Sequence, residues 1–247
     1  MNKENKFDIQ IRKLDEKVLL VQFPQIIDEA LLNFIIGLKA AIDEQLKDIP
    51  HQVFNTYAEI CVHYLNKPRS FNEELDLLKR TIERYQAEQS DQGHLARTSK
   101  YCIPVCYEQE FARDIQFVAS HNVISKEEVV RVHQQPIYRV YFIGFLPGFP
   151  YLGGMSKKIS TPRKKQARKR IQKGDVGIAG GQTGLYPVRS PGGWQIIGNS
   201  PIDLIDFRQN DDVLLKAGDL VEFYPISREE HRAILYQEKK INLKENV

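Results

Sequence analysis

The sequence predicts an α+β protein with two parts: an N-terminal α/β sandwich-like domain and a C-terminal domain built mainly of β-strands. Apolar stripes at helical spacing occur within residues 1–90, between shorter strand-like runs. From Pro136 onward, short β-type runs are separated by glycine and proline, a pattern typical of an all-β barrel or sandwich. We therefore expect domains at residues 1–90 and 101–235, a linker at 91–100 and a tail at 236–247.

The N-terminal domain is expected to have the order ββαββα. Residues 7–11 and 17–23 are strand-like, and residues 52–65 hold two strands or one long bent strand. Asp28 and Ser70 are the expected caps of the two helices, and Glu73 occupies the capping-box position of the second. The apolar stripes of these helices are Leu31, Ile35, Leu38, Ile42 and Leu46, then Phe71, Leu75, Leu78, Ile82 and Tyr85. Two helices packed on one face of a mainly antiparallel sheet follow from this order.

Two short helices are expected to lead into the barrel, after a strand at residues 101–107. The first ends near Asn122, because asparagine tolerates the left-handed conformation at a helix end. Ser125 is the expected cap of the second, with Glu128 three residues later. We expect His133 to be a surface residue of this second helix.

The charge of the chain is concentrated in one basic segment. The net charge is +3, yet residues 157–173 carry nine Lys and Arg and no acid, which leaves the rest mildly acidic. We expect this basic segment to be a solvated, mobile loop, with an anionic ligand or an acidic partner subunit as the open alternatives. It lacks interleaved aromatic residues and a surrounding recognition module, so nucleic acid is not expected as a partner.

The start of the chain and its apolar runs bear on location. The sequence MNKENKFDIQ has no apolar core of a signal peptide, and no apolar run approaches the length of a membrane span. Cys61, Cys102 and Cys106 fit neither a disulfide framework nor a zinc site. We therefore expect free thiols, a cytoplasmic protein and no membrane association.

Familiar catalytic motifs are absent from the sequence. It contains no P-loop and no H-E-x-x-H, and the glycine-rich run GIAGGQTG does not match G-x-G-x-x-G. Ser190 lies in RSPGG rather than in a nucleophile elbow. These absences argue against a P-loop nucleotide site, a dinucleotide site, a metal centre and a self-sufficient serine hydrolase.

A group of glycine-rich loops is the strongest sign of a site. GFLPGFPYLGG, STPRKKQARKR, GIAGGQTGLYP and SPGGWQIIGNSP follow one another closely, and such loops converge at the mouth of a barrel. The backbone amides of Gly180 and Gly181, together with Arg163, are suited to an anionic group. Further expected substrate-binding residues are Gln182 and Thr183 as polar groups, and Phe149, Tyr186 and Trp194 as an apolar wall.

Structural interpretations of the same residues remain open. Glycines between strands commonly serve only as turns and bulges, and a single tryptophan is commonly a core residue. His121, at the end of a helix, is either a dipole-favoured terminal residue or a catalytic acid–base group. We take it as the candidate catalytic residue.

The loops also resemble a known family. YRVYFIGFLPGFPYLGG, TPR, VGIAGGQTGLYP and SPGGWQIIG, in this order, are similar to the B subunit of the bacterial ATP-dependent 5-oxoprolinase. The family includes the Kip-type inhibitor of a sporulation histidine kinase and the first-subunit module of allophanate hydrolase. The resemblance is dense over residues 138–225. Two departures are ARDI at 112–115, where relatives usually have Gly-Pro-Asp-Leu, and the basic KKQARKR after TPR.

The resemblance implies both a fold and a function. It implies that the second domain is a cyclophilin-like β-barrel, and that the chain acts with the A and C subunits to convert 5-oxo-L-proline to L-glutamate with ATP. It also implies that the chain is inactive alone, with the ATP used by the complex. The alternatives are an inhibitor that binds a histidine kinase and a component of an allophanate or urea amidohydrolase.

Overall fold

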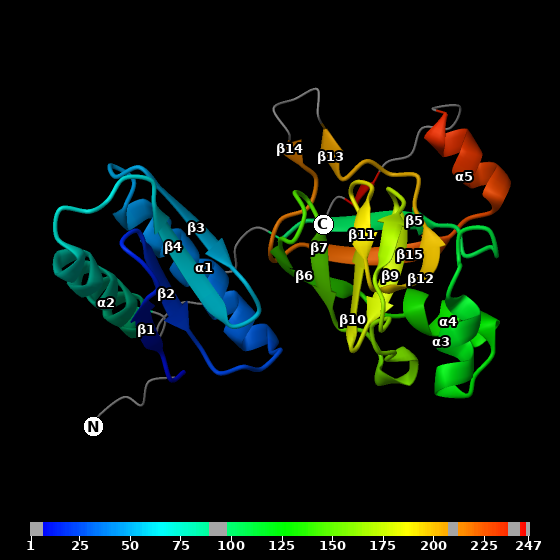
Figure 1. The fold of residues 1–247 in the computed structure, drawn as a ribbon, viewed down its shortest axis with the longest axis horizontal. Coiled ribbons are helices and arrows are strands. Elements are labelled where there is room, and N and C mark those ends of the chain that lie inside the picture. Colours follow the sequence, from blue (N-terminus) through cyan, green and yellow to red (C-terminus); the bar gives the residue numbers. More distant parts are fainter. Residues whose placement is uncertain (1–6, 89–97, 207–211, 237–242, 246–247) are drawn as a thin grey trace. The chain divides into compact units, whose positions relative to one another are not determined.

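The computed structural model describes residues 7–88, 98–206, 212–236 and 243–245, and its chain divides into two compact units, residues 1–97 and 98–247 (Figure 1). Each unit has its own hydrophobic core. The expected linker at 91–100 lies mostly outside the described residues, and Lys100 already begins a strand. No helix in the described ranges is long and apolar enough to cross a bilayer.

The N-terminal unit is a four-stranded antiparallel sheet with two helices. Its sheet order is β1-β2-β4-β3, so the strand pairs β1–β2 and β3–β4 are joined through the central β2–β4 contact. Both helices contribute to the single core of this unit. In chain order the elements are β1 (Gln10–Lys13), β2 (Val18–Gln22), α1 (Glu29–Gln45), β3 (His51–Asn55), β4 (Glu59–Tyr64) and α2 (Phe71–Glu88).

Local sequence explains where these elements begin and end. The Asp28 carboxylate accepts a hydrogen bond from the Leu31 amide at 2.8 Å, which confirms the expected cap of α1. Ser70 Oγ accepts from the Glu73 amide at 3.4 Å at the start of α2. Residues 52–65 form two strands rather than one bent strand, and the Thr56 amide donates to the Glu59 carbonyl across the turn between them.

The C-terminal unit contains the remaining elements of the described chain. Its helical elements are α3 (Ile115–Asn122), α4 (Lys126–Gln134), the 3₁₀ turn η1 (Lys157–Ile159) and α5 (Arg228–Leu235). Its strands are β5 (Lys100–Val105), β6 (Tyr138–Ile143), β7 (Pro150–Gly153), β8 (Arg168–Ile171), β9 (Asp175–Ala179), β10 (Gln182–Leu185), β11 (Ser190–Gly192), β12 (Gln195–Asn199), β13 (Ile205–Asp206), β14 (Asp212–Val213), β15 (Leu220–Pro225) and β16 (Lys244–Glu245).

The largest sheet of this unit curls into a nearly closed barrel. Its order is β12-β9-β10-β7-β6-β15-β5-β16, with β15 and β5 parallel and the other pairs antiparallel. Just after β5, Cys106 exchanges backbone hydrogen bonds with Asn199 at the end of β12, at 2.8 and 3.0 Å. This bridge brings the two sides of the sheet together, and we call it the barrel seam. The α+β fold class is confirmed.

The barrel wall has two differently used faces. Side chains alternate along a strand, so neighbours such as Ile196 and Ile197 pack into different cores. One face shares the main core of the unit with α3 and α4, which lie side by side (Figure 1). The other face carries a smaller core made by Phe149, Ile171, Ala179, Tyr186, Trp194 and Ile196. We call this smaller core the aromatic cluster.

Two local expectations in this unit are wrong. The part of the chain after Pro136, expected to be built of β-type runs, also contains the helix α5, which has a complete capping box between Ser227 and Glu230. The left-handed residue after α3 is Val123, at φ 56°, rather than Asn122. Asn122 stays helical because its side-chain amide donates to the Val118 carbonyl at 2.9 Å and to Thr161 Oγ1 at 3.0 Å.

Candidate functional site

The aromatic cluster joins three of the predicted site residues. The ring of Phe149 lies 5.0 Å from that of Tyr186 and 5.4 Å from that of Trp194, in both cases edge to face. All three side chains are almost fully buried, at 1%, 1% and 6% exposure. The rings therefore support the surface above them, and they offer little area to a ligand.

Two glycines of the predicted loops are required by the close approach of these rings. A Cβ at Gly184 would lie 2.8 Å from Phe149 Cζ, and one at Gly192 would lie 2.6 Å from the Tyr186 hydroxyl. Contacts this short do not occur between real side chains, so only glycine fits at both positions. The glycines of VGIAGGQTGLYP and SPGGWQIIG thus serve packing in part.

The segment GFLPGFPYLGG forms the turn between β6 and β7, at residues 144–149, and then continues through β7. The Gly144 amide donates to the Phe149 carbonyl at 3.1 Å, and the Phe149 amide donates to the Leu146 carbonyl at 3.1 Å. Phe145 has a φ of 66°, which is uncommon for a residue with a side chain, and its side chain is 64% exposed. The turn therefore inserts Phe149 into the aromatic cluster and displays Phe145 to solvent.

Arg163 lies at the rim of the aromatic cluster. It is exposed beside Gly193, whose carbonyl accepts from the neighbouring Lys164 amide at 2.8 Å. Burial raises the pKa of Tyr186 to about 12, and the positive charge of Arg163 acts in the opposite direction. Arg163 makes no ion pair with any described residue. Its guanidinium is therefore available to an anion.

The two polar residues predicted on β10 point to different faces of the sheet. Gln182 is half-buried at the start of the strand. Thr183 is fully buried, and its hydroxyl donates to the Gly177 carbonyl at 2.9 Å. Because the hydroxyl proton is used there, His133 must donate its Nε2–H to Thr183 Oγ1, 2.9 Å away. The structure thus places Thr183 in the core and away from any surface that a substrate reaches.

The same contacts overturn the expectation that His133 lies on the surface. His133 is 0% exposed, and its Nδ1 accepts from the Tyr107 hydroxyl at 2.9 Å. Burial lowers the pKa of His133 to about 3, so the ring is neutral at physiological pH. Both of its nitrogens are satisfied, which identifies it as a structural core residue.

The predicted catalytic residue, His121, lies apart from this group. It is exposed near the end of α3, and its ring stacks on that of Phe117 with centroids 6.1 Å apart. No hydrogen bond or ring contact within the described ranges joins His121 to Phe149, Arg163 or Trp194. A catalytic role for His121 remains a prediction.

The anion nest expected at Gly180 is partly occupied by the protein itself. The Gly180 amide donates to the Thr161 carbonyl at 2.7 Å, and its carbonyl accepts from the Thr161 amide at 3.3 Å. These bonds fasten the segment that carries Arg163 to the β9–β10 turn. The Gly180 amide is thus unavailable to an anionic group.

The basic segment is tied to the barrel rather than uniformly solvated. Asp114 accepts two hydrogen bonds from Arg168 at 2.6 Å each and one from Lys164 at 3.1 Å. It also accepts from the Ile196 amide at 2.7 Å. Burial acts to raise the pKa of Asp114, but these donors outweigh it and the pKa is lowered. Asp114 thus pins the basic segment to β12, which corrects the expectation of a mobile loop.

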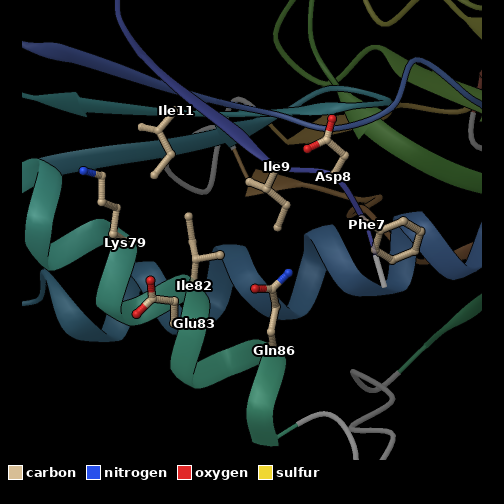
Figure 2. Close-up of a pocket in the computed structure, with 8 residues that line it drawn as sticks. All are labelled: Phe7, Asp8, Ile9, Ile11, Lys79, Ile82, Glu83 and Gln86. Carbon is tan, nitrogen blue, oxygen red and sulfur yellow. The ribbon is translucent and has the colours of Figure 1, made fainter. Parts of the chain in front are cut away.

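A pocket in the N-terminal unit offers no comparable chemistry. Figure 2 shows it between the start of β1 and α2, with Ile9, Ile11 and Ile82 turned toward it and Lys79 and Glu83 along the helix. Its volume is about 390 Å³. Its polar residues are exposed or half-buried, and they do not converge on one point in Figure 2.

Comparisons with known proteins identify the family. The family "Carboxyltransferase domain, subdomain C and D" matches residues 9–215. The chain is 38% identical over 230 residues to the B subunit of 5-oxoprolinase from Bacillus subtilis, across 91% of this chain and 95% of that protein. The chain belongs to the 5-oxoprolinase B-subunit family. A more distant relative is urea amidolyase of Saccharomyces cerevisiae, 26% identical over 237 residues, which are 90% of this chain and 12% of the relative.

Solved structures have a similar fold. The protein TTHA0988 is 31% identical with a TM-score of 0.71; the match covers 88% of this chain and 40% of that one, so this chain spans less than half of it. Urea carboxylase of Kluyveromyces lactis matches with a TM-score of 0.73 and 19% identity, over 93% of this chain and 23% of that one. This second likeness shows the fold alone. The expectation of a cyclophilin-like barrel is confirmed.

Proposed function

We propose that the chain is the B subunit of an ATP-dependent 5-oxoprolinase, which acts with the A and C subunits to convert 5-oxo-L-proline to L-glutamate. The observation that carries this proposal is the 38% identity to a protein of that name over 91% of the chain. The relative is matched over 95% of its own length, so the likeness covers both units and not only the barrel.

The reaction explains why a complex and ATP are needed. An unstrained lactam is a stable amide, so ring opening requires activation of its carbonyl carbon. Transfer of the γ-phosphoryl group of ATP to the lactam oxygen supplies this activation and releases ADP. Water then adds to the carbon, the ring C–N bond breaks with protonation of the nitrogen, and hydrolysis releases phosphate and glutamate. The chain has no P-loop, and we assign ATP to the complex as a whole.

The predicted residues suggest how this chain contributes. Arg163 is an exposed cation without an ion-pair partner in the described chain, at the rim of the aromatic cluster. Phe145 is displayed at the same cluster, with its ring 5.9 Å from that of Phe149. A cation and an exposed aromatic ring suit an acidic protein surface or an anionic substrate. We propose that this rim, supported by Phe149, Tyr186 and Trp194, contacts a partner subunit or the substrate within the assembly.

The test is reconstitution. The chain is mixed with its cognate A and C subunits, and glutamate release from 5-oxo-L-proline is measured with and without ATP. We expect activity only in the complete mixture with ATP, and none with the chain alone. Equal activity with this chain left out would contradict the proposal and would favour a regulator, to be tested next on histidine kinase autophosphorylation.

A second candidate is a component of a urea or allophanate amidohydrolase, favoured by the 26% identity to urea amidolyase. The chain covers only 12% of that relative, so this candidate has the weaker support. It predicts ammonia release from allophanate in the reconstituted assembly, where 5-oxo-L-proline gives no glutamate.

A further inference from the structure

A pocket of about 470 Å³ lies beside α5, outside the aromatic cluster. It is formed entirely by the C-terminal unit, from segments around Arg113, Asp175, Asn199 and His231. Figure 1 shows α5 standing apart from α3 and α4. The barrel seam is part of the pocket wall. The backbone of Asn199 forms the seam with Cys106, and Asn199 also lines the pocket.

A chain of buried polar groups runs along this pocket. Asp175 accepts from Asn199 Nδ2 at 3.0 Å, from the Gln172 amide at 2.8 Å and from the guanidinium of Arg113. Asn199 Nδ2 also donates to the Lys173 carbonyl at 3.0 Å. Both contacts of this nitrogen are to oxygens that only accept, which fixes the amide orientation and leaves Asn199 Oδ1 as the acceptor.

The orientation of Asn199 determines which nitrogen of His231 carries a proton. His231 Nε2 lies 2.8 Å from Asn199 Oδ1, so Nε2 must be the donor. Burial lowers the pKa of His231, and the neutral ring therefore has its lone pair on Nδ1. His231 is 4% exposed, and its Nδ1 has no hydrogen-bond partner among the described residues. A buried acceptor left unpaired costs free energy.

The hydroxyl of Ser200, another residue that lines the pocket, also lacks a hydrogen-bond partner within the described chain. Ser200 is 2% exposed. Arg113 uses one amino group on Asp175, and its other N–H groups have no described partner. The Phe111 ring lies 4.4 Å from that of His231 and gives the pocket an apolar side. The pocket thus combines a cation, a hydroxyl, a neutral acceptor and an aromatic surface.

We propose that this pocket binds a small carboxylic acid that also carries an N–H donor. The carboxylate receives hydrogen bonds from Arg113 and the Ser200 hydroxyl, and the N–H of the ligand donates to His231 Nδ1. The hydrocarbon part of the ligand packs against Phe111. Each partnerless polar group of the pocket then acquires a partner of the right kind. Asp175 and Asn199 are positioning residues, since they act by orienting Arg113 and His231.

The choice of the first ligand rests on the proposed function. 5-Oxo-L-proline has a carboxylate and a lactam N–H on one small ring, and both groups are suited to this pocket. Two analogues separate the two contacts: N-methyl-5-oxo-L-proline lacks the N–H, and 2-pyrrolidinone lacks the carboxylate. Binding of all three is measured by calorimetry, on the full chain and on the chain assembled with its partner subunits. We expect each analogue to bind about 10- to 100-fold more weakly than 5-oxo-L-proline.

Variants test the location of the site. Ser200→Ala should weaken 5-oxo-L-proline binding about tenfold and leave the fold intact, because its hydroxyl has no described partner to lose. Arg113→Lys keeps the charge near Asp175 and should weaken binding by a similar factor. Ser120→Ala is the matched control, since Ser120 is an exposed residue of α3 outside the pocket lining. Arg163→Gln tests the rim of the aromatic cluster in the same assay.

The outcomes distinguish the pocket from the proposed function. Binding that is weakened by Ser200→Ala and Arg113→Lys, and unchanged by Ser120→Ala, supports the pocket whether or not the assembly releases glutamate. Binding that is lost only in Arg163→Gln overturns the pocket and places the ligand at the rim. No saturable binding in either form of the protein, with glutamate released by the assembly, overturns the pocket and leaves the proposed function standing.

Discussion

The interior of the barrel and the pocket beside α5 each bury a histidine in the same tautomer, but they satisfy it differently. His133 donates from Nε2 to Thr183 and accepts at Nδ1 from Tyr107. His231 donates from Nε2 to Asn199, and its Nδ1 has no described partner. Both ring nitrogens of His133 are used within the fold, whereas Nδ1 of His231 is left for the proposed ligand. We infer from this contrast that the pocket beside α5, rather than the interior of the barrel, is the binding region.

The largest expected effect comes from the aromatic cluster, which, like the surroundings of His133, we interpret as scaffold. Phe149→Ala should lower the free energy of unfolding of the barrel unit by about 3–5 kcal/mol, because it leaves a cavity among Tyr151, Tyr186 and Trp194. The only tryptophan, Trp194, reports this unit alone by fluorescence during urea unfolding. Phe145→Ala is the control, since that ring is 64% exposed and should cost less than about 1 kcal/mol. Equal losses in the two variants would contradict a scaffold role for the cluster.

Asp114 is a second buried group whose partners are all within the protein, and it holds the basic segment in place. Asp114→Asn should cost about 2–3 kcal/mol, because Arg168 and Lys164 lose a buried carboxylate. The lowered pKa of Asp114 means that its contribution is present above the pKa of the unfolded chain, near 3.8, and is lost as pH falls through the folded value. The urea midpoint of the wild-type chain and of Asp114→Asn is measured at pH 7 and at pH 3. The difference between the two proteins should be smaller at pH 3. Glu128→Gln, at an exposed pair with Arg131, is the control and should leave the urea midpoint nearly unchanged.

The buried histidine gives a pH dependence of its own. The pKa of His133 is about 3 in the folded chain and near 6.5 in the unfolded chain. Between these two pH values the unfolded chain binds a proton that the folded chain does not bind. Its stabilisation is complete above pH 6.5, and unfolding becomes easier by about 1.4 kcal/mol per pH unit as pH falls toward 3. His133→Gln should flatten this part of the profile. The lowered pKa of His231 acts in the same direction. An unchanged slope in His133→Gln would show that groups other than His133 cause the pH dependence.

The smallest expected effect is the most direct test of the contrast. Thr183→Val should cost about 1–2 kcal/mol, because His133 and the Gly177 carbonyl both lose a partner. Ser200→Ala should change stability by no more than about 0.5 kcal/mol, since its equally buried hydroxyl has no described partner. Thermal and urea unfolding of the two variants measure the difference. A loss in Ser200→Ala as large as that in Thr183→Val would show that Ser200 is satisfied in solution.

Much of the fold is predictable because its signals are local. The caps at Asp28 and Ser125 are each a single side chain followed at fixed spacing by an amide, and both are confirmed. The helix α5 escapes prediction although the pair Ser227 and Glu230 carries the same kind of signal. The only apolar residues of α5 are Ala233, Ile234 and Leu235, which are adjacent, so no apolar stripe at helical spacing marks this helix.

The candidate site is predictable only where neighbouring loops build it. Phe149, Tyr186 and Trp194 do come together, because the motifs that contain them lie on adjacent strands. Assigning Thr183 to the same surface neglects strand alternation, which turns it toward the opposite face from Gln182. The pocket beside α5 draws on residues 110–113, 172–175, 199–202 and 231–235. No local pattern connects segments so far apart in the chain.

The barrel seam links local opening of the barrel to opening of the pocket beside α5. Asn199 joins the two sides of the barrel through its backbone and orients His231 through its side chain. Any fluctuation that parts Cys106 from Asn199 therefore disorders the pocket at the same moment. Exchange of these two amide protons with solvent requires that same opening. Binding of the proposed ligand should therefore slow this exchange, because the same residue closes the barrel and orients His231.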